Sequence, residues 1–369
     1  MHKNIPPVYY GDYLHLDKIL GAQKLQSEKY AEAAHDETLF IIVHQVYELW
    51  FKQILHELNS IISIFASNNV DDRDLTTVVH RLRRVTQIQQ IMNDQISVME
   101  TMTPQEFLAF RDYLVPASGF QSIQFKQLEI SLGLKREYRI DFDQQSFYLR
   151  LTEDDRAYLT NLEKQPSLFE LVDKWLARMP LLEIDGFSFW QLYKTVTEDY
   201  LAEDRQTITQ NQGLSQTERN KELAALAQTE AKFSALLDEA QYQELLDSGQ
   251  FRLSQKAMLS ALFIKQYSQE PIFNLPFQFI TLLTEVDEKL TIWRHRHAMM
   301  VHRMLGGKIG TGGSAGHEYL HRTTQANRVF VDFFDMATFL LPKHLLPKLP
   351  DEVTRYLEFH LYQANKTKV

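Results

Sequence analysis

Apolar residues recur at three- and four-residue steps along most of the chain, which is the spacing of one face of an α-helix. The pattern is clearest over Asp36–Phe65 and returns more weakly over Val79–Met99. Pro104 opens another helix that stops at Pro116, and the turn ASGFQS then separates it from a helix beginning at Ile123. The periodicity predicts an all-α fold.

Two stretches depart from this regular pattern. Residues 141–160 predict a short helix and a loop. Residues from about 202 to 255 are polar and charged, with a helical stretch over Lys221–Leu246, and predict a solvent-facing helical hairpin or an inserted lobe. We find no internal repeat and no linker long enough to require a boundary. We therefore expect a single large helical domain over residues 1–369, with a polar helical excursion at about 202–255.

Composition agrees with a large helical core and narrows the chemistry. The chain has 369 residues, 44% of them hydrophobic, with only 13 glycines and 11 prolines. The formal charge of −9 and the absence of a basic run with interleaved aromatic residues argue against nucleic-acid binding. There is no cysteine, which excludes disulfides, thiolate ligands, iron–sulfur clusters and a cysteine-ligated haem.

The chain shows no signal for secretion or membrane insertion. Its first residues, MHKNIPPVYYGDYL, lack the apolar segment of a secretory signal peptide. No apolar run approaches the roughly 20 residues that a membrane-spanning helix needs. We expect a cytoplasmic protein with no membrane partner.

One helix carries a histidine on its apolar face and leads into a glycine-rich segment. Its apolar stripe at helical spacing consists of Val286, Leu290, Trp293, His297, Met300, Val301 and Met304. His297 lies in the middle of this stripe, whereas His295 and His302 share a polar face with Glu288. A neutral imidazole in apolar surroundings suits the axial position of a haem iron. The alternative is a core histidine satisfied by one hydrogen bond.

The glycine-rich segment that follows offers three interpretations. Gly306 and Gly307 fit the end of the helix through a left-handed cap, and later glycines bracket Thr311 and Ser314. The run GTGGSAG resembles a phosphate-binding loop only weakly, because it lacks the Gly-Lys-Ser/Thr ending and follows a helix. A flexible connector is the simplest interpretation. A lid whose Thr311 hydroxyl meets a bound ligand is the functional hypothesis.

Two further polar residues lie among aromatic ones. An aromatic progression at helical spacing consists of Phe40, His44, Tyr47 and Phe51. His44 within it is either an ordinary buried histidine or a functional one. Arg111 follows Phe107 on a mostly apolar helix. It forms either a surface pair with Asp112 or a partly buried guanidinium that binds a carboxylate through two parallel hydrogen bonds.

A competing hypothesis places two iron ions in a helical bundle. Glu32-Ala-Ala-His35 and Glu318-Tyr-Leu-His321 both have the Glu-x-x-His spacing of di-iron carboxylate sites, for which Glu48 and Glu57 are candidate further ligands. Glu318 follows the glycine-rich segment, which is unlike the mid-helix position of such ligands. A third possibility is a non-catalytic helical interaction module, with both apolar-face histidines in its core.

Several long segments together resemble the family of haem-dependent tryptophan 2,3-dioxygenases, in the order in which that family carries them. These segments are YGDYLHLDKIL, HDETLFIIVHQVYELWFKQILHEL, FRDYLVPASGFQSIQF, LLEIDGFSFW and WRHRHAMMVHRMLGGKIGTGGSAG. The resemblance implies an all-α fold of the tryptophan/indoleamine dioxygenase type and an oxidoreductase that inserts O2 across the indole C2–C3 bond of L-tryptophan. The product would be N-formyl-L-kynurenine, in the first step of tryptophan catabolism by the kynurenine pathway.

The same resemblance implies a cofactor and an assembly. The cofactor is haem b, one per subunit, with O2 as co-substrate, and the assembly is a homotetramer. The axial ligand to the haem iron falls on His297. Residues near the haem fall on Ser118, Trp293 and Tyr319. Lys126 stands where many relatives carry arginine, so a bidentate contact to a haem propionate would become a point-charge contact.

The substrate site implied by the resemblance lies opposite the iron ligand. The distal histidine of the family, which is catalytic, falls on His44, and the residues that line or grip the substrate fall on Phe40, Phe107, Arg111 and Thr311. In the family Arg111 would bind the carboxylate and Thr311 the charged end of the amino acid. Tyr10 and Tyr13 match aromatic residues that a neighbouring subunit lends to the site.

Overall fold

The described part of the chain is predominantly helical. The computed structural model describes residues 6–67, 70–139, 147–148, 151–178, 183–184, 187–308, 316–350 and 353. The β-structure in these residues is one two-stranded antiparallel ribbon, β1 (Glu183–Ile184) and β2 (Phe187–Ser188). The predicted all-α class is therefore confirmed. None of the helices in the described ranges is long and apolar enough to span a membrane.

The chain divides into two compact units. Unit 1 comprises residues 1–57, 85–165 and 288–328, and unit 2 comprises 58–84, 166–287 and 329–369. Three long helices, α4 (His35–Ala66), α5 (Asp72–Met99) and α15 (Asn274–Leu305), contribute residues to both units. That residues 1–369 form a single domain stays a prediction.

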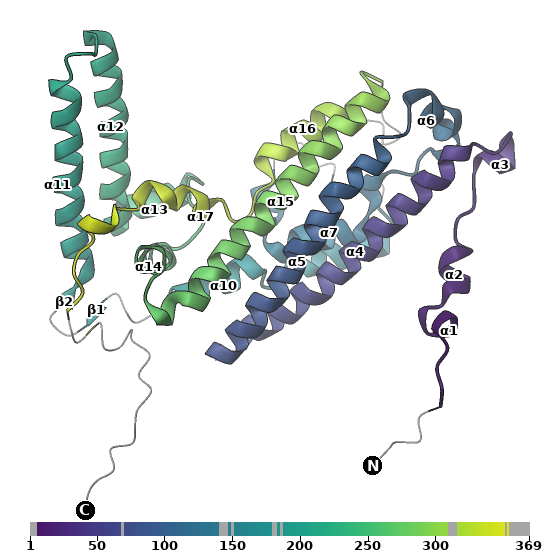
Figure 1. Ribbon diagram of the computed structural model, residues 1–369, viewed down its shortest axis with the longest axis horizontal. Coiled ribbons are helices and arrows are strands. Elements are labelled where there is room, and N and C mark those ends of the chain that lie inside the picture. Colours follow the sequence, from purple (N-terminus) through teal and green to yellow (C-terminus); the bar gives the residue numbers. More distant parts are fainter. Residues whose placement is uncertain are drawn as a thin grey trace, which may run out of the picture. The chain divides into compact units, whose positions relative to one another are not determined.

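In unit 1, parts of α4, α5 and α15 lie side by side (Figure 1). The remaining described helices of this unit are α1 (Tyr10–Leu14), α2 (Leu16–Leu20), α3 (Ser27–Tyr30), α6 (Pro104–Arg111), η1 (Asp112–Leu114), η2 (Gly119–Gln121), α7 (Ile123–Leu132), η3 (Arg136–Tyr138), α9 (Glu153–Leu162) and α16 (Gly316–Ala326). Gln95 on α5 donates a hydrogen bond to the backbone of α4 at Val43, 3.1 Å away. Asn93 on α5 donates to the backbone of α15 at Lys289, also at 3.1 Å. These bonds fix the register of the three helices.

Local sequence explains where these helices begin and end. Thr103 and Glu106 form a reciprocal capping box at the start of α6, with Pro104 in the first turn. Ser122 caps α7 by accepting from the Phe125 amide at 3.2 Å. Gly306 ends α15 with a φ of 57°, as the left-handed cap predicted. The predicted helix starts at Pro104 and Ile123 are also confirmed.

Unit 2 is built around aromatic side chains from several of its helices. Its described elements, besides the ribbon, are α10 (Leu168–Leu176), α11 (Phe189–Gln210), α12 (Gln216–Leu237), α13 (Glu239–Asp247), α14 (Gln255–Gln266), η5 (Pro271–Phe273), α17 (Val331–Asp335), η6 (Met336–Phe339) and η7 (Lys343–Leu345). Phe189 on α11 contacts Phe263 of α14 and Tyr267, the residue that follows α14, with ring centroids 4.8 and 5.6 Å apart. These contacts hold the base of α11 in the core.

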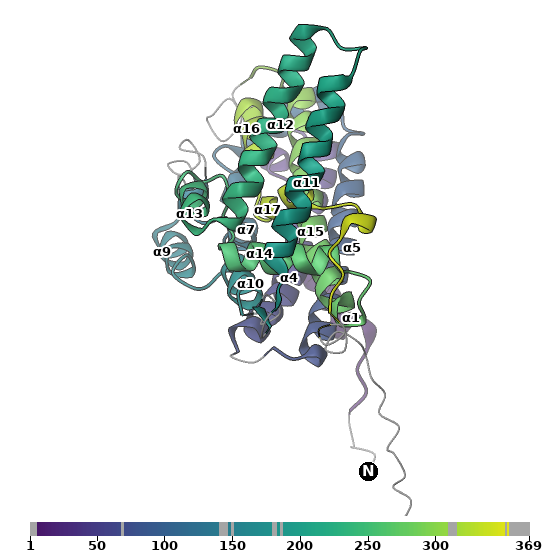
Figure 2. The same ribbon diagram turned by 90° about the vertical axis from the view of Figure 1, so that its left-hand side faces the viewer.

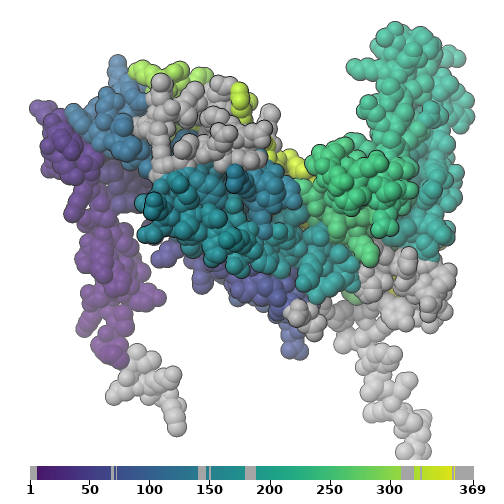
Figure 3. All heavy atoms as spheres, turned by 180° about the vertical axis from the view of Figure 1, so that it is seen from behind, coloured from purple at the N-terminus to yellow at the C-terminus, as the bar shows by residue number. Residues whose placement is uncertain are grey.

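The polar region from 202 to 255 is a helical hairpin followed by a short helix, as Figure 2 shows for α11, α12 and α13. The two helices of the hairpin pack against each other. Their atoms form one continuous teal column in the space-filling view of Figure 3. The prediction of one continuous helical stretch over Lys221–Leu246 was wrong, because the chain forms two helices that are separated at Asp238. Asp238 has an extended backbone and accepts from the Gln241 amide at 2.8 Å, so it ends α12 and caps α13.

Candidate functional site

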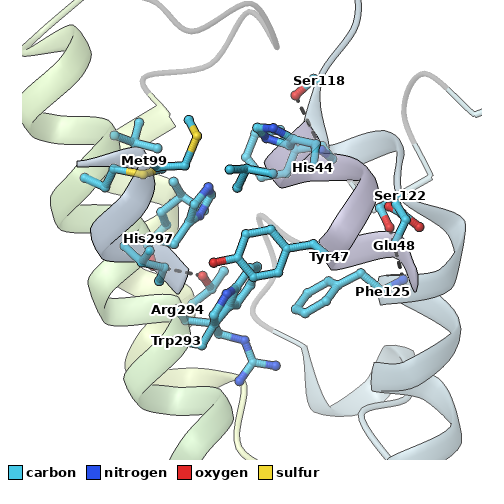
Figure 4. A pocket seen from close by; sticks show the side chains of 18 of the residues that line it. His44, Tyr47, Glu48, Met99, Ser118, Ser122, Phe125, Trp293, Arg294 and His297 are labelled. Carbon is cyan, nitrogen blue, oxygen red and sulfur yellow. Dashed lines mark hydrogen bonds between the residues drawn. The ribbon is translucent and has the colours of Figure 1, made fainter. Parts of the chain in front are cut away.

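Unit 1 contains an apolar cavity of about 270 Å³. Its walls come from α4, α5, α7, α15 and α16 and from the segment around η2. Figure 4 shows His44 from α4 and His297 from α15 pointing into this space. The two histidines that the sequence placed on apolar or aromatic helix faces therefore line the same cavity.

His297 is held as a neutral imidazole. Burial, together with the smaller electrostatic effect of nearby His44, lowers the pKa of His297 to about 4. Its ring stacks on that of Trp293, with centroids 5.3 Å apart and planes within 2° of each other. His295 and His302 are exposed, as the helical pattern predicted. A neutral, oriented imidazole facing an apolar cavity has the properties of an axial metal ligand.

His44 lies on the opposite wall with its ring fixed by its own helix. Its Nδ1 is 2.7 Å from the carbonyl oxygen of Phe40, and the two rings lie 4.1 Å apart. A carbonyl oxygen only accepts, so Nδ1 carries the proton. Burial lowers the pKa of His44, although the hydrogen bond to Phe40 and the charge of Glu48 oppose this shift. The neutral ring therefore presents Nε2 as a hydrogen-bond acceptor.

An aromatic cluster joins α4, α7 and α15 beneath the two histidines. Trp293 contacts Tyr47, Phe51 and Phe125, with ring centroids 5.8, 6.2 and 5.1 Å apart. The Tyr47 hydroxyl donates to the backbone of Met92 at 2.9 Å, and burial raises the pKa of Tyr47 to about 12. Tyr47 therefore stays protonated and serves to pack and to anchor α5.

The cavity lining is more polar near η2 and the start of α7. Ser118 and Ser122 line the cavity as capping residues, each accepting a backbone N–H. Lys126 is buried on the same wall, with Nζ 3.9 Å from the centroid of the Phe147 ring. The guanidinium carbon of Arg139 is 3.5 Å from that ring. The wall thus combines hydroxyl groups with a desolvated cation.

The α6 helix brings Phe107 to the cavity beside Phe40, with ring centroids 5.7 Å apart. Arg111, one turn further along, is not among the residues that line the cavity. Its side chain is 16% exposed, and Nη1 lies 3.3 Å from the Asp112 carboxylate. Arg111 therefore combines features of the two interpretations offered from sequence. It pairs with Asp112, and its guanidinium is mostly buried.

Some predicted site residues are not brought to the cavity or lie outside the description. Tyr10 and Tyr13 on α1 are 75% and 71% exposed and do not line the cavity. Thr311 lies outside the described residues, and Tyr319 belongs to α16 without its side chain being described. Their proposed roles stay predictions.

The structure adds cavity residues that the sequence had not assigned to this site, including Glu48, which was considered only as a di-iron ligand. Met99 at the end of α5 and Met102 just beyond it line the cavity, and Glu48 lines it one turn after His44. Arg294 also lines it, in a buried ion pair with Glu129 of α7. Glu48 lies one helical turn from His44, so helical spacing could have identified it as a cavity residue. Arg294 directly follows Trp293 and therefore does not share its helix face, and Glu129 is remote in sequence, so no local pattern identified either residue.

The di-iron hypothesis gains no support from the positions of the described side chains. Within the described ranges, no group of three or more histidine, aspartate or glutamate side chains is placed to share a metal ion. Glu57 instead accepts a hydrogen bond from Gln53 at 2.7 Å, and Glu48 accepts one from Gln124 at 2.8 Å.

Comparison with known proteins agrees with the segments quoted above. The sequence model of one family, described as tryptophan 2,3-dioxygenase, matches residues 3–340. A tryptophan 2,3-dioxygenase of Alteromonas mediterranea is 67% identical over 98% of this chain and 100% of its own length. One from Bdellovibrio bacteriovorus is 46% identical over 96% of this chain and 99% of its own length. One from Mus musculus is 42% identical over 94% of this chain and 86% of its own length.

Proposed function

The chain belongs to the tryptophan 2,3-dioxygenase family, and from this premise we propose that the cavity of unit 1 binds haem b through His297 and L-tryptophan beside His44. The enzyme is an oxidoreductase that converts L-tryptophan and O2 to N-formyl-L-kynurenine, at the start of tryptophan catabolism. The observation that carries the proposal is the pair of neutral histidines facing one apolar cavity.

The side chains around the cavity fit a haem group. His297 offers an unprotonated nitrogen on an apolar wall, as an axial ligand requires. Ser118 and Lys126 offer a hydroxyl and a cation on the more polar wall, which suit the acidic groups at a haem edge. Trp293 fixes the plane of the imidazole, and we assign Tyr319 to the same end of the cofactor. The bound iron supplies the activation of O2.

His44 orients the indole ring of the substrate. Because Nδ1 donates to the Phe40 carbonyl, Nε2 accepts the hydrogen bond of the indole N–H. An indole N–H is far too weakly acidic for an imidazole whose pKa is lowered by burial to remove its proton. His44 therefore acts by position and polarity. Phe40 and Phe107 provide the aromatic surface on which the ring lies.

The charged end of tryptophan binds on the α6 side of the site. We assign its carboxylate to Arg111, whose planar guanidinium matches a carboxylate through two parallel bonds. On substrate binding this contact replaces or supplements the one to the exposed Asp112 carboxylate. Thr311 receives the ammonium group. Charge recognition at one end and ring packing at the other hold C2 and C3 of the indole at a defined position.

The enzyme is proposed to work as a homotetramer. Tyr10 and Tyr13 project from a short helix with more than two thirds of each side chain exposed. Large exposed aromatic side chains on a surface helix suit burial against another copy of the chain. We assign them to the substrate site of a neighbouring subunit.

Replacing His297 with alanine tests the cofactor assignment. We expect the purified His297→Ala protein to lose the Soret band, because the cavity wall then lacks its axial nitrogen. The matched control is His295→Ala on the same helix, whose exposed side chain leaves the spectrum unchanged.

An unchanged Soret band and unchanged N-formylkynurenine formation in His297→Ala would refute this assignment. Formation of the product is measured after anaerobic reduction of the haem-loaded protein and addition of tryptophan and O2. Added imidazole fills the space left by the side chain and should restore part of the band in His297→Ala.

A further inference from the structure

Arg294 is a buried cation on the cavity wall with two partners from different elements. Its Nη2 lies 2.7 Å from a carboxylate oxygen of Glu129 on α7. Its Nη1 donates to the backbone carbonyl of Asn327 at 2.7 Å. All three residues are at most 5% exposed and all belong to unit 1.

The second partner marks the end of a helix that forms part of the cavity. Asn327 follows Ala326, the last residue of α16, and its amide closes the final turn on Thr323 at 3.0 Å. Leu320 and Thr323 lie on one face of α16, Asn327 continues that face just beyond the helix, and all three line the cavity. A cation is favourable at this end of a helix, where backbone carbonyls lack partners within the helix.

We propose that Arg294 is a positioning residue that fastens the C-terminal end of α16 to α7 and thereby fixes the α16 wall of the cavity. Only a planar guanidinium spans both partners, because its two Nη groups donate in fixed directions. Burying an ion pair is costly unless each charge is well bonded, so the arrangement needs both contacts. In sequence, Arg294 lies between Trp293, whose ring stacks on the imidazole of His297, and His297 itself, the proposed iron ligand.

This inference deepens the proposed function, since it assigns α16 as a wall of the haem and tryptophan site. It makes its own prediction about the helix, which does not depend on what the cavity binds. The two proposals are therefore tested by different measurements. The spectrum of His297→Ala tests the cofactor assignment, and hydrogen exchange of α16 tests the role of Arg294.

The variant Arg294→Lys keeps the positive charge but loses the planar guanidinium with its two Nη donors. We expect hydrogen exchange of the α16 amides to become about tenfold faster in both the haem-loaded and the haem-free protein, the effect of losing one charge-assisted hydrogen bond. Transfer of haem to apomyoglobin should accelerate, and the KM for tryptophan should rise more than kcat falls. Exchange is read by mass spectrometry on peptides covering residues 320–327.

The same helix provides a matched control in Arg296. It donates to the backbone carbonyl of Asn93 and contacts the Glu100 carboxylate at 3.2 Å, so it has the same two kinds of partner. Those partners lie on and just after α5, and the Arg296 side chain is 32% exposed. We expect Arg296→Lys to leave α16 exchange, haem transfer and KM unchanged.

A second variant keeps the test valid if Arg294→Lys does not fold. Glu129→Gln is isosteric, retains an acceptor and removes the countercharge, and it should accelerate α16 exchange in the same direction. Exchange and haem transfer within twofold of the wild type in both variants would overturn the proposal, and so would equal effects in Arg296→Lys.

Discussion

The chemical character of each cavity histidine depends on where its side chain lies. His297 and His44 are both of a type whose pKa is ordinarily about 6.5, and burial lowers the pKa of each. Sequence periodicity selected both residues because they share faces with aromatic and apolar neighbours. It did not give the proton position on His44, which follows from a hydrogen bond to Phe40 that only the folded helix forms.

The lowered pKa of His297 makes stability depend on pH in the haem-free protein. The pKa is about 4 in the folded state and about 6.5 in the unfolded state, so between these values the unfolded chain binds the extra proton. The free energy of unfolding should therefore fall as the pH is lowered from about 6.5 towards 4, by at most about 1.4 kcal/mol per pH unit from this residue. Urea unfolding at pH 7 and pH 5 measures the change.

The variant His297→Gln isolates this contribution. It should show a smaller loss of stability between the two pH values than the wild type, because glutamine does not titrate. The control variant His295→Gln changes an exposed histidine, and its free energy of unfolding should fall between pH 7 and pH 5 as much as that of the wild type. Equal losses in the wild type and in His297→Gln would contradict the burial argument.

At the scale of elements, the helix pattern was largely predictable because apolar spacing and capping are local. The starts of α6 and α7 follow from Pro104 and Ser122, and the end of α15 follows from Gly306. The break at Asp238 was missed because the apolar pattern continues across it. A single capping side chain there outweighs the periodicity of its neighbours.

The capping box of α6 gives a prediction about substrate binding. Thr103→Ala removes the side-chain acceptor for the Glu106 amide and should loosen the helix by about 0.5–2 kcal/mol. Because α6 carries Phe107 and Arg111, the KM for tryptophan should rise severalfold while the Soret band stays unchanged. The KM for tryptamine should rise less, because tryptamine lacks the carboxylate assigned to Arg111.

The matched control for this variant is in unit 2. Ser215→Ala removes an equivalent capping box at the start of α12 and should leave the KM for tryptophan unchanged. If both variants raised KM equally, the effect would reflect general stability. An equal rise for tryptophan and tryptamine in Thr103→Ala would count against the carboxylate assignment.

At the scale of the whole molecule, the cavity draws on segments from Phe40 to Asn327 but stays within unit 1. A ligand that binds only the folded site stabilises the elements that form it. Haem loading should therefore slow hydrogen exchange in the cavity-lining parts of α4, α7 and α15 more than in the α11–α12 hairpin of unit 2. Comparing haem-free and haem-loaded protein by mass spectrometry measures this. Uniform slowing of both units would contradict the prediction.

The amino-acid sequence by itself determined the helical class, most helix boundaries and the histidine that faces inwards. These properties depend on the spacing of residues within one helix, and a single stretch of sequence contains that spacing. Only the tertiary structure decided which helices share the cavity, that His44 and His297 face one another across it, and that Arg294 pairs with Glu129 and Asn327. Those partners lie more than 30 residues from Arg294, so their meeting depends on the packing of separate helices.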